Sequence, residues 1–424
     1  MRQLFVSGFM NELDTAATEY NWPDGGFIWL ADEAEGSQLI PTPGKVSTLR
    51  VRLCDASGNP ASPGAGNSWT FSLRKSGNPT DLSCTISDAE TAGGDATHSV
   101  SVSTWDYISL EAAPGGTPSS GRYAIWSMVF QGDDPEECVL LGPYECYYEL
   151  ATAPPYYNLL KQATSYNITE SNRSSLFPTP GTIKKLAVCV TPAPGAGKSV
   201  SVRLRLGSAW TSLSDTPVVV TISGTDTQGQ DTEHSQAVDA AEYVALMFTS
   251  VGAPAGLRLG WASVFIPTSE REFPLYIGGG LTAGSDQVYN YPVAYGSFNA
   301  NEAYRRALAG QCTLKRLYLF HSLASGRTMT VMKSGAATDL AVTLGSGQTL
   351  GSDLAHEVEF VEDDYVNLRF SAGADTNRVL CGLTGVMPAL GPAGIAAVNE
   401  VAAAGIDRLN ALPWGGIAKV NKVA

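Results

Sequence analysis

The sequence has few charged residues and no long hydrophobic run. Only 16% of its 424 residues are charged, and the formal net charge is −14. An acidic surface of this kind repels phosphate groups and anionic lipids, so we expect no nucleic-acid partner. No apolar run approaches the length of a membrane span, so we expect no membrane insertion. The N-terminal apolar stretch is short and is followed by Glu12 and Asp14, unlike a signal peptide, which predicts folding in a cytoplasm.

Motifs for metal binding or nucleophilic catalysis are also missing. The chain has four histidines and seven cysteines, but no C-x-x-C pair and no G-x-S-x-G. These are patterns of zinc sites and of serine hydrolases. We therefore expect no enzyme activity, no cofactor and no metal. Cys138 and Cys146 are close in sequence, and whether they form a disulfide stays open at this point.

Glycine and proline are abundant and spread along the chain. There are 44 Gly and 24 Pro, while hydrophobic residues make up 44% of the sequence. Short alternating segments, such as residues 49–53 and 200–204, are separated by Gly/Pro/Ser/Asn turns. This combination is typical of many short strands with one buried face. It predicts an all-β chain of tandem antiparallel β-sandwiches that are jelly-roll-like, with a strand order that the pattern does not specify.

Internal repetition is the strongest signal in the chain. Asp-x-x-His occurs three times, and a tyrosine follows each histidine by nine residues. The residues are Asp95, His98 and Tyr107, then Asp231, His234 and Tyr243, then Asp353, His356 and Tyr365. Aspartate and histidine are metal ligands, but no further ligand lies at a suitable spacing. Recurrence in every copy favours a structural role, in which Asp closes a turn and His begins the next strand.

Other landmarks recur in the same order and divide the chain. Pro-Thr-Pro-Gly stands at 41–44 and at 178–181, and Trp126 is matched by Trp261. The third copy has Gly310 in the first landmark and lacks the tryptophan. The landmarks predict sandwiches at 1–131, 132–267 and 268–389, followed by a tail at 390–424.

Three further patterns have a structural interpretation that we prefer. Residues 194–199 resemble the end of a phosphate-binding loop, but 63–68 fill the same slot without the lysine, which indicates a hairpin turn. The acidic clusters at 133–137 and 362–364 lack the spacing of a calcium loop and predict solvated loop charge. Aromatic residues could stack on sugars or fill the core; they are Tyr20, Trp22, Tyr156, Tyr157, Tyr289, Tyr291 and Tyr295.

The tail has a different character from the rest of the chain. An I-x-x-[VL]-N pattern recurs every eleven residues, in an Ala- and Gly-rich segment. So few apolar positions cannot form a core alone. The stripe must pack on the sandwiches, on copies of itself or on another protein, and we prefer oligomerisation or docking to a terminus that merely packs. Its candidate assembly residues are Ile395, Val398, Val401, Ile406, Leu409, Leu412, Trp414, Ile417, Val420 and Val423.

The repeat plan and the terminal I-A-K-V-N-K-V resemble structural proteins of tailed bacteriophages. The resemblance rests on P-x-P/A-G-x-[VI]-x-x-L, the strand at 70–77 and D-x-x-H-[SE]. It implies a virion component, either a tail or neck fibre or a capsid decoration protein. Independently of the resemblance, tandem sandwiches predict a rigid, extended rod. The expected partners are other virion proteins, copies of the chain itself and a host-surface glycan. The alternative hypothesis is a carbohydrate-binding or cell-surface adhesion protein.

Overall fold

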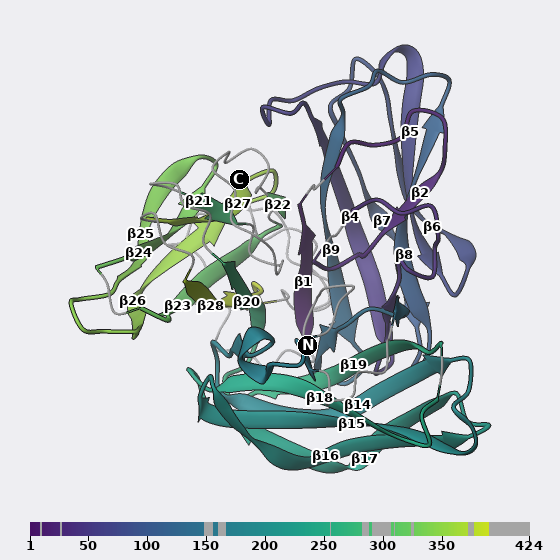
Figure 1. Cartoon of the computed structure of the whole chain (residues 1–424). Coiled ribbons are helices and arrows are strands. Elements are labelled where there is room, and N and C mark those ends of the chain that lie inside the picture. The colour runs from purple at the N-terminus through teal and green to yellow at the C-terminus, as the bar shows by residue number, and fades with distance from the viewer. Residues whose placement is uncertain are drawn as a thin grey trace, which may run out of the picture. The chain divides into compact units, whose positions relative to one another are not determined.

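Antiparallel strands follow one another along the whole described chain, as Figure 1 shows for the computed structural model. The described residues are 1–8, 11–25, 28–147, 156–159, 167–254, 256–281, 288–290, 307–308, 310–323, 326–371 and 377–389. Among them the only helical element is the short 3-10 turn η1 (Glu170–Asn172). No helix in these ranges has the length and hydrophobicity needed to span a membrane. The all-β prediction is confirmed.

The first sandwich contains nine strands in two sheets. They are β1 (Arg2–Ser7), β2 (Glu19–Asn21), β3 (Gln38–Leu39), β4 (Gly44–Cys54), β5 (Gly64–Lys75), β6 (Asn78–Asp88), β7 (Ala92–Val102), β8 (Tyr107–Gly115) and β9 (Tyr123–Gly132). One sheet has the order β1-β9-β4-β7 and the other β2-β8-β5-β6, with β3 paired to β8.

The second sandwich repeats this plan. Its strands are β10 (Cys138–Leu141), β11 (Cys146–Tyr147), β12 (Tyr156–Tyr157), β13 (Ser175–Leu176), β14 (Gly181–Thr191), β15 (Gly195–Ala209), β16 (Ser212–Gly224), β17 (Gln228–Val238), β18 (Tyr243–Val251) and β19 (Arg258–Pro267). The sheets run β10-β19-β14-β17 and β12-β18-β15-β16, with β13 paired to β18.

The third sandwich repeats it again. Its strands are β20 (Glu272–Leu281), β21 (Val288–Asn290), β22 (Ala307–Leu308), β23 (Cys312–His321), β24 (Thr328–Lys333), β25 (Ala336–Thr343), β26 (Leu350–Phe360), β27 (Tyr365–Phe370) and β28 (Arg378–Val386). The sheets are β20-β28-β23-β26 and β21-β27-β24-β25.

Each copy therefore has the strand order of an eight-stranded jelly roll. The chain passes from sheet to sheet at most turns, and only β5–β6, β15–β16 and β24–β25 are direct hairpins. The predicted jelly-roll-like sandwiches are confirmed, and the structure supplies the strand order. Trp126 and Trp261 are fully buried between the sheets, and Cys381 occupies the equivalent position in the third copy.

The glycine-rich segment at 194–199 is not the predicted hairpin turn. It connects β14 in one sheet to β15 in the other, and Gly195 opens β15 with φ +97°. Gly64 opens β5 in the same way with φ +96°. Glycine adopts this conformation without strain, which explains why both copies carry it at the crossover.

A disulfide between Cys138 and Cys146 is excluded by strand pairing. Both residues pair with β19, Cys138 with Phe265 and Cys146 with Leu259. Six positions along a strand correspond to about 20 Å, whereas a disulfide needs Cα atoms within about 7 Å. Cys138 is a buried free thiol that donates to the Phe265 carbonyl at 3.3 Å.

The three sandwiches contact one another and do not form the extended rod that we predicted. Residues 1–387 make one compact unit. One buried hydrophobic cluster contains residues of all three sandwiches, among them Leu4, Ile183 and Leu314. Burial of apolar surface between sandwiches stabilises this arrangement over one of separated domains.

Candidate functional site: the contacts between sandwiches

Every sandwich contacts the next through equivalent elements. The short strand before the Pro-Thr-Pro-Gly landmark contacts the last strand of the following sandwich, as β3 contacts β19 and β13 contacts β28. In the third sandwich, β22 contacts β9 of the first. The contacts therefore close a ring of three sandwiches. We call the first two contacts the first joint and the second joint, and the third contact the seam.

A buried carboxylate lies at the first joint. The Glu137 side chain, which is 1% exposed, accepts a hydrogen bond from the Thr42 hydroxyl of the first sandwich at 2.6 Å. Its other oxygen accepts from Lys185 at 2.7 Å and contacts Lys184 at 3.0 Å. Burial alone would raise the pKa of Glu137, but the bonds from Lys185, Thr42 and Lys184 outweigh it and lower that pKa. Glu137 is thus not the solvated loop charge that we predicted.

The second joint repeats this arrangement with different residues. Glu272 is almost fully buried and accepts a hydrogen bond from Thr179 of the second sandwich at 2.6 Å. Its other oxygen contacts Lys315 at 2.8 Å and Arg316 at 3.3 Å. In both joints one sandwich supplies the hydroxyl, and the next supplies the carboxylate and two cations. We call each such group a carboxylate cluster.

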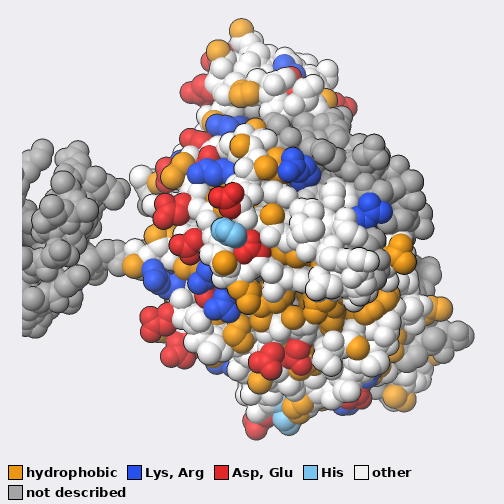
Figure 2. All heavy atoms as spheres, turned by 90° about the vertical axis from the view of Figure 1, so that its left-hand side faces the viewer, with side chains coloured by type: hydrophobic (Ala, Val, Ile, Leu, Met, Phe, Trp, Pro, Cys, Tyr) orange, Lys and Arg blue, Asp and Glu red, His pale blue; other side chains and the backbone are white. Residues whose placement is uncertain are grey.

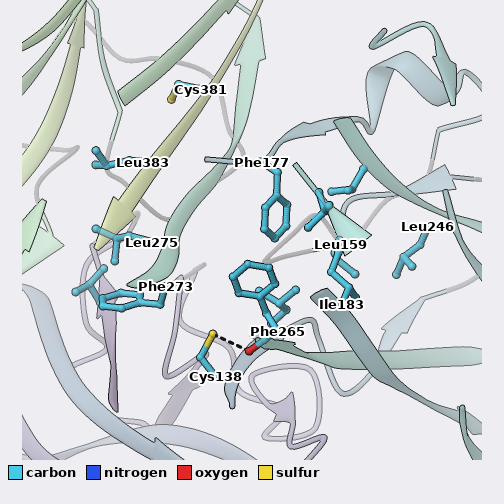
Figure 3. Packing of buried hydrophobic residues seen from close by; sticks show 14 of the residues in the cluster. Cys138, Leu159, Phe177, Ile183, Leu246, Phe265, Phe273, Leu275, Cys381 and Leu383 are labelled. Carbon is cyan, nitrogen blue, oxygen red and sulfur yellow. Dashed lines mark hydrogen bonds between the residues drawn. The ribbon is translucent and has the colours of Figure 1, made fainter. Parts of the chain in front are cut away.

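Hydrophobic packing completes the second joint. Figure 3 shows Phe177 and Phe265 of the second sandwich near Phe273, Leu275 and Leu383 of the third. The rings of Phe177 and Phe265 have centroids 5.0 Å apart, and each of these five side chains is at most 1% exposed. Phe273 follows Glu272 directly in the chain, and Glu272 is itself only 2% exposed, so its hydrogen bonds are shielded from water and are stronger for it.

The seam lacks the carboxylate cluster altogether. Strand register places Gly310 where the joints have threonine, and Arg2 where they have glutamate. Ser47 and Thr48 stand where the joints have the two cations. A Cβ atom on Gly310 would lie 2.7 Å from Cδ1 of Leu4, so glycine permits the close approach of the third sandwich to the first.

The seam is formed by the same backbone elements as the first joint. Gly8 forms an antiparallel bridge with Ala307, in the position of the bridge between Pro143 and Gln38 at the first joint. Its ion pair joins Arg50 to Glu362 at 2.6 Å, with Glu362 half-exposed.

The Asp-x-x-His motif lies inside a strand in each copy, which corrects the predicted turn. In β7 the three residues after Asp95 bulge opposite Thr48, whose φ is +59°. Asp95 accepts hydrogen bonds from the backbone N–H groups of Thr97 and His98, at 2.9 and 3.1 Å. It therefore supplies the acceptors that the interrupted strand pairing no longer provides.

The same aspartate also ties the two sheets together. Asp95 accepts from the Ser83 N–H of β6, Asp231 from Val219 and Asp353 from Ala341, at 2.9–3.2 Å. Each pair joins the edge strands of opposite sheets. Burial would raise the pKa of Asp95, but hydrogen bonds led by those from the His98 and Thr97 backbones outweigh it and hold the pKa well below its ordinary value.

The bulge positions the histidine of the motif, and the turn after the strand positions the tyrosine. The His98 Nδ1 lies 2.8 Å from Asp95, and His234 and His356 repeat the contact while their rings remain about half-exposed. The acid before each tyrosine caps a turn, as Asp106 does by accepting from Ser103 N–H at 2.8 Å. The tyrosines Tyr107, Tyr243 and Tyr365 begin β8, β18 and β27.

No group of three or more metal-ligating side chains is assembled within the described ranges. An open groove of about 660 Å³ lies beside Asp353 and His356. The Asp353 carboxylate and the His356 ring nitrogen that face it are already hydrogen-bonded to each other. Two glutamates near each other, Glu33 and Glu111, are both bound by Arg74 at 3.0 and 2.9 Å. Figure 2 shows one face, on which acidic and basic side chains are interspersed and a band of hydrophobic side chains lies between them.

The side chains of four of the seven aromatic landmark residues are described. Trp22 and Tyr157 are buried, whereas Tyr20 and Tyr156 are partly buried. The side chains of Tyr289, Tyr291 and Tyr295 lie outside the described residues. All ten candidate assembly residues of the tail, from Ile395 to Val423, also lie outside them.

Sequence reasoning missed the carboxylate clusters, although one signal was available. The threonine of Pro-Thr-Pro-Gly is kept in the two copies that have a successor and is replaced by Gly310 in the third. Glu137 and Glu272 stand just before or at the first strand of those successors. Only the fold shows that these residues from different copies meet.

Comparisons with known proteins leave the family open. No family model and no curated protein matches the chain. Among solved structures, a chain from the Sulfolobus Turreted Icosahedral Virus structure is 11% identical, with 84% of each chain covered and a TM-score of 0.19. PNGF-II is 6% identical over 77% of this chain and 98% of its own, with a TM-score of 0.20. Paenibacillus xanthan lyase is 9% identical over 80% and 51%, with a TM-score of 0.16. These scores are too low to carry an argument about fold or function.

Proposed function

We propose that the chain is a non-enzymatic structural component of a bacteriophage virion, a tail or neck fibre or a capsid decoration protein. The observation that carries the proposal is that the repeated polar residues form hydrogen bonds between strands and between sandwiches. Asp95, Asp231 and Asp353 hold strands together, while Thr42 and Thr179 hold sandwiches together. Recurrent residues that serve architecture in this way fit a building element better than a catalyst.

Assembly is proposed to proceed through protein–protein contacts with copies of the chain and with other virion proteins. The resemblance to phage structural proteins and the apolar stripe of the tail support this. The adhesion alternative gains no support from the aromatic landmark, since none of its four described side chains is fully exposed. A glycan partner stays part of the proposal only as a further ligand of the assembled particle.

Light scattering after size exclusion tests the proposal on the full chain and on a chain that ends at Pro388. We expect a defined oligomer for the full chain and, at low protein concentration where the ring of each copy stays closed, a folded monomer for the shorter one, because residues 1–387 form a compact unit of their own. Two monomers would contradict self-assembly through the tail. Turnover of a polysaccharide that one carboxylate substitution abolishes would contradict the non-enzymatic role.

A further inference from the structure

The seam differs from the two joints in how it is held. The first joint is tethered by the five residues 133–137 and the second by the four residues 268–271. The two sides of the seam are separated by most of the chain, from β1 to β22. Short links keep the joints at a high effective concentration within one molecule, and the seam has no link of that kind.

The polar contacts of the seam are also weaker. Each joint has a carboxylate that is at most 3% exposed and has three bonded partners. At the corresponding positions the seam has Gly310, Arg2, Ser47 and Thr48, which cannot form such a cluster. The seam instead has the Arg50–Glu362 pair, whose side chains are 26% and 54% exposed, and a bond from Arg52 to the Asp363 carbonyl. Exposed pairs contribute little to stability and are screened by salt. The seam thus has neither the short link nor the buried polar contacts of the joints, and its two sides are held mainly by apolar contacts such as that of Leu4 at Gly310.

The two sides of the seam are different surfaces that fit one another. The donor surface is β22 with Gly310, and the acceptor surface is β1 with β9. Such a head-to-tail contact either closes a ring within one assembly or continues from molecule to molecule. A molecule whose seam is open presents one unpaired surface of each kind.

We propose that the seam opens and that the donor surface of one copy then binds the acceptor surface of a second copy. The partner of this interaction surface is thus another copy of the chain. The inference deepens the proposed self-assembly and rests on it, but it uses a surface other than the tail.

Two variants of the full chain, each with one added cysteine, test the exchange. Gly8→Cys and Ala307→Cys lie on opposite sides of the seam bridge. Directly opposed residues of antiparallel strands have Cα atoms about 5 Å apart, which suits a disulfide. One variant is isotope-labelled, the two are mixed at high concentration under mild oxidation, and mass spectrometry identifies the covalent heterodimer. The matched control is Gln38→Cys mixed with Pro143→Cys, at the equivalent bridge of the first joint.

We expect several-fold more heterodimer from the seam pair than from the control pair. Each pair placed within one chain should give an intrachain disulfide, which verifies folding and geometry. Equal yields from the two mixtures would overturn the proposal. If light scattering shows an oligomer but the seam pair gives no excess, self-assembly stands and the seam exchange fails.

Hydrogen exchange on the unmodified chain gives a second readout that needs no substitution. The amides of β22 at the seam are compared with those of β3 at the first joint, since both strands pair with the equivalent strand of their own sandwich. We expect about tenfold faster exchange at β22, because opening removes the cover of β1 and β9 and leaves this two-residue strand paired with β27 alone. Equal protection of the two strands would contradict opening at the seam.

Discussion

At the scale of single residues, buried carboxylates accept the hydrogen bonds that hold strands and sandwiches together. Asp231 accepts from the backbone N–H groups of Glu233, His234 and Val219 and contacts the His234 ring. The aspartate is the only side chain of the motif that is buried in all three copies, whereas the histidine remains half-exposed. The carboxylate, and not the imidazole, is therefore the essential member of Asp-x-x-His.

Asp231→Ala should destabilise the chain by about 1–3 kcal/mol, because it leaves buried N–H groups without an acceptor. The matched control is Glu233→Ala, two positions away on the exposed side of the same strand, with a change within about 0.5 kcal/mol. His234→Ala should lie between the two. Thermal and urea unfolding midpoints measure the effect, and equal midpoints for Asp231→Ala and Glu233→Ala would contradict the assigned role.

At the scale of elements, one strand of each sandwich links the fold to its contacts with the neighbouring sandwich: β4, β14 and β23. A single residue with positive φ interrupts it in every copy: Thr48, Lys185 and Arg316. The interruption lies opposite the Asp-x-x-His bulge, and in the second and third copies it carries a cation of the carboxylate cluster. One irregularity in the strand thus serves both sheet closure and the joint between sandwiches.

Glu272→Ala should destabilise the second joint by about 1–3 kcal/mol, because Thr179, Lys315 and Arg316 lose their common acceptor. Glu270→Ala, at an exposed position two residues earlier, is the control and should have little effect. Glu272→Gln keeps an acceptor for Thr179 and should be intermediate. Calorimetry measures the midpoints, and a Glu272→Ala variant as stable as Glu270→Ala would show that the cluster contributes nothing.

At the scale of the whole molecule, the three sandwiches depend on one another. Ala187 and Ala262 of the second sandwich are fully buried in the core cluster of the first. Leu176 and Tyr243 of the second sandwich belong to a cluster with Phe320 and Leu380 of the third. Apolar side chains on both sides of the second sandwich are therefore buried by its neighbours.

An isolated second sandwich, residues 133–271, should unfold several degrees below residues 1–387 and bind a hydrophobic dye. The reason is that its separation exposes apolar surface that the neighbours cover. Thermal unfolding followed by circular dichroism and dye fluorescence checks this. An isolated sandwich with an unchanged midpoint and no dye binding would show that the sandwiches are independent domains.

The sequence by itself determined the β-structure, the threefold repetition and the structural character of Asp-x-x-His. These features depend on local alternation and on spacing within one copy, which the chain displays directly. Tertiary structure alone decided the strand order, the ring, the separation of Cys138 from Cys146 and the partners of Glu137 and Glu272. Alternation assigns a face to each side chain but not a neighbour to each strand, and the residues of a carboxylate cluster come from segments of two sandwiches that only the packed fold brings together.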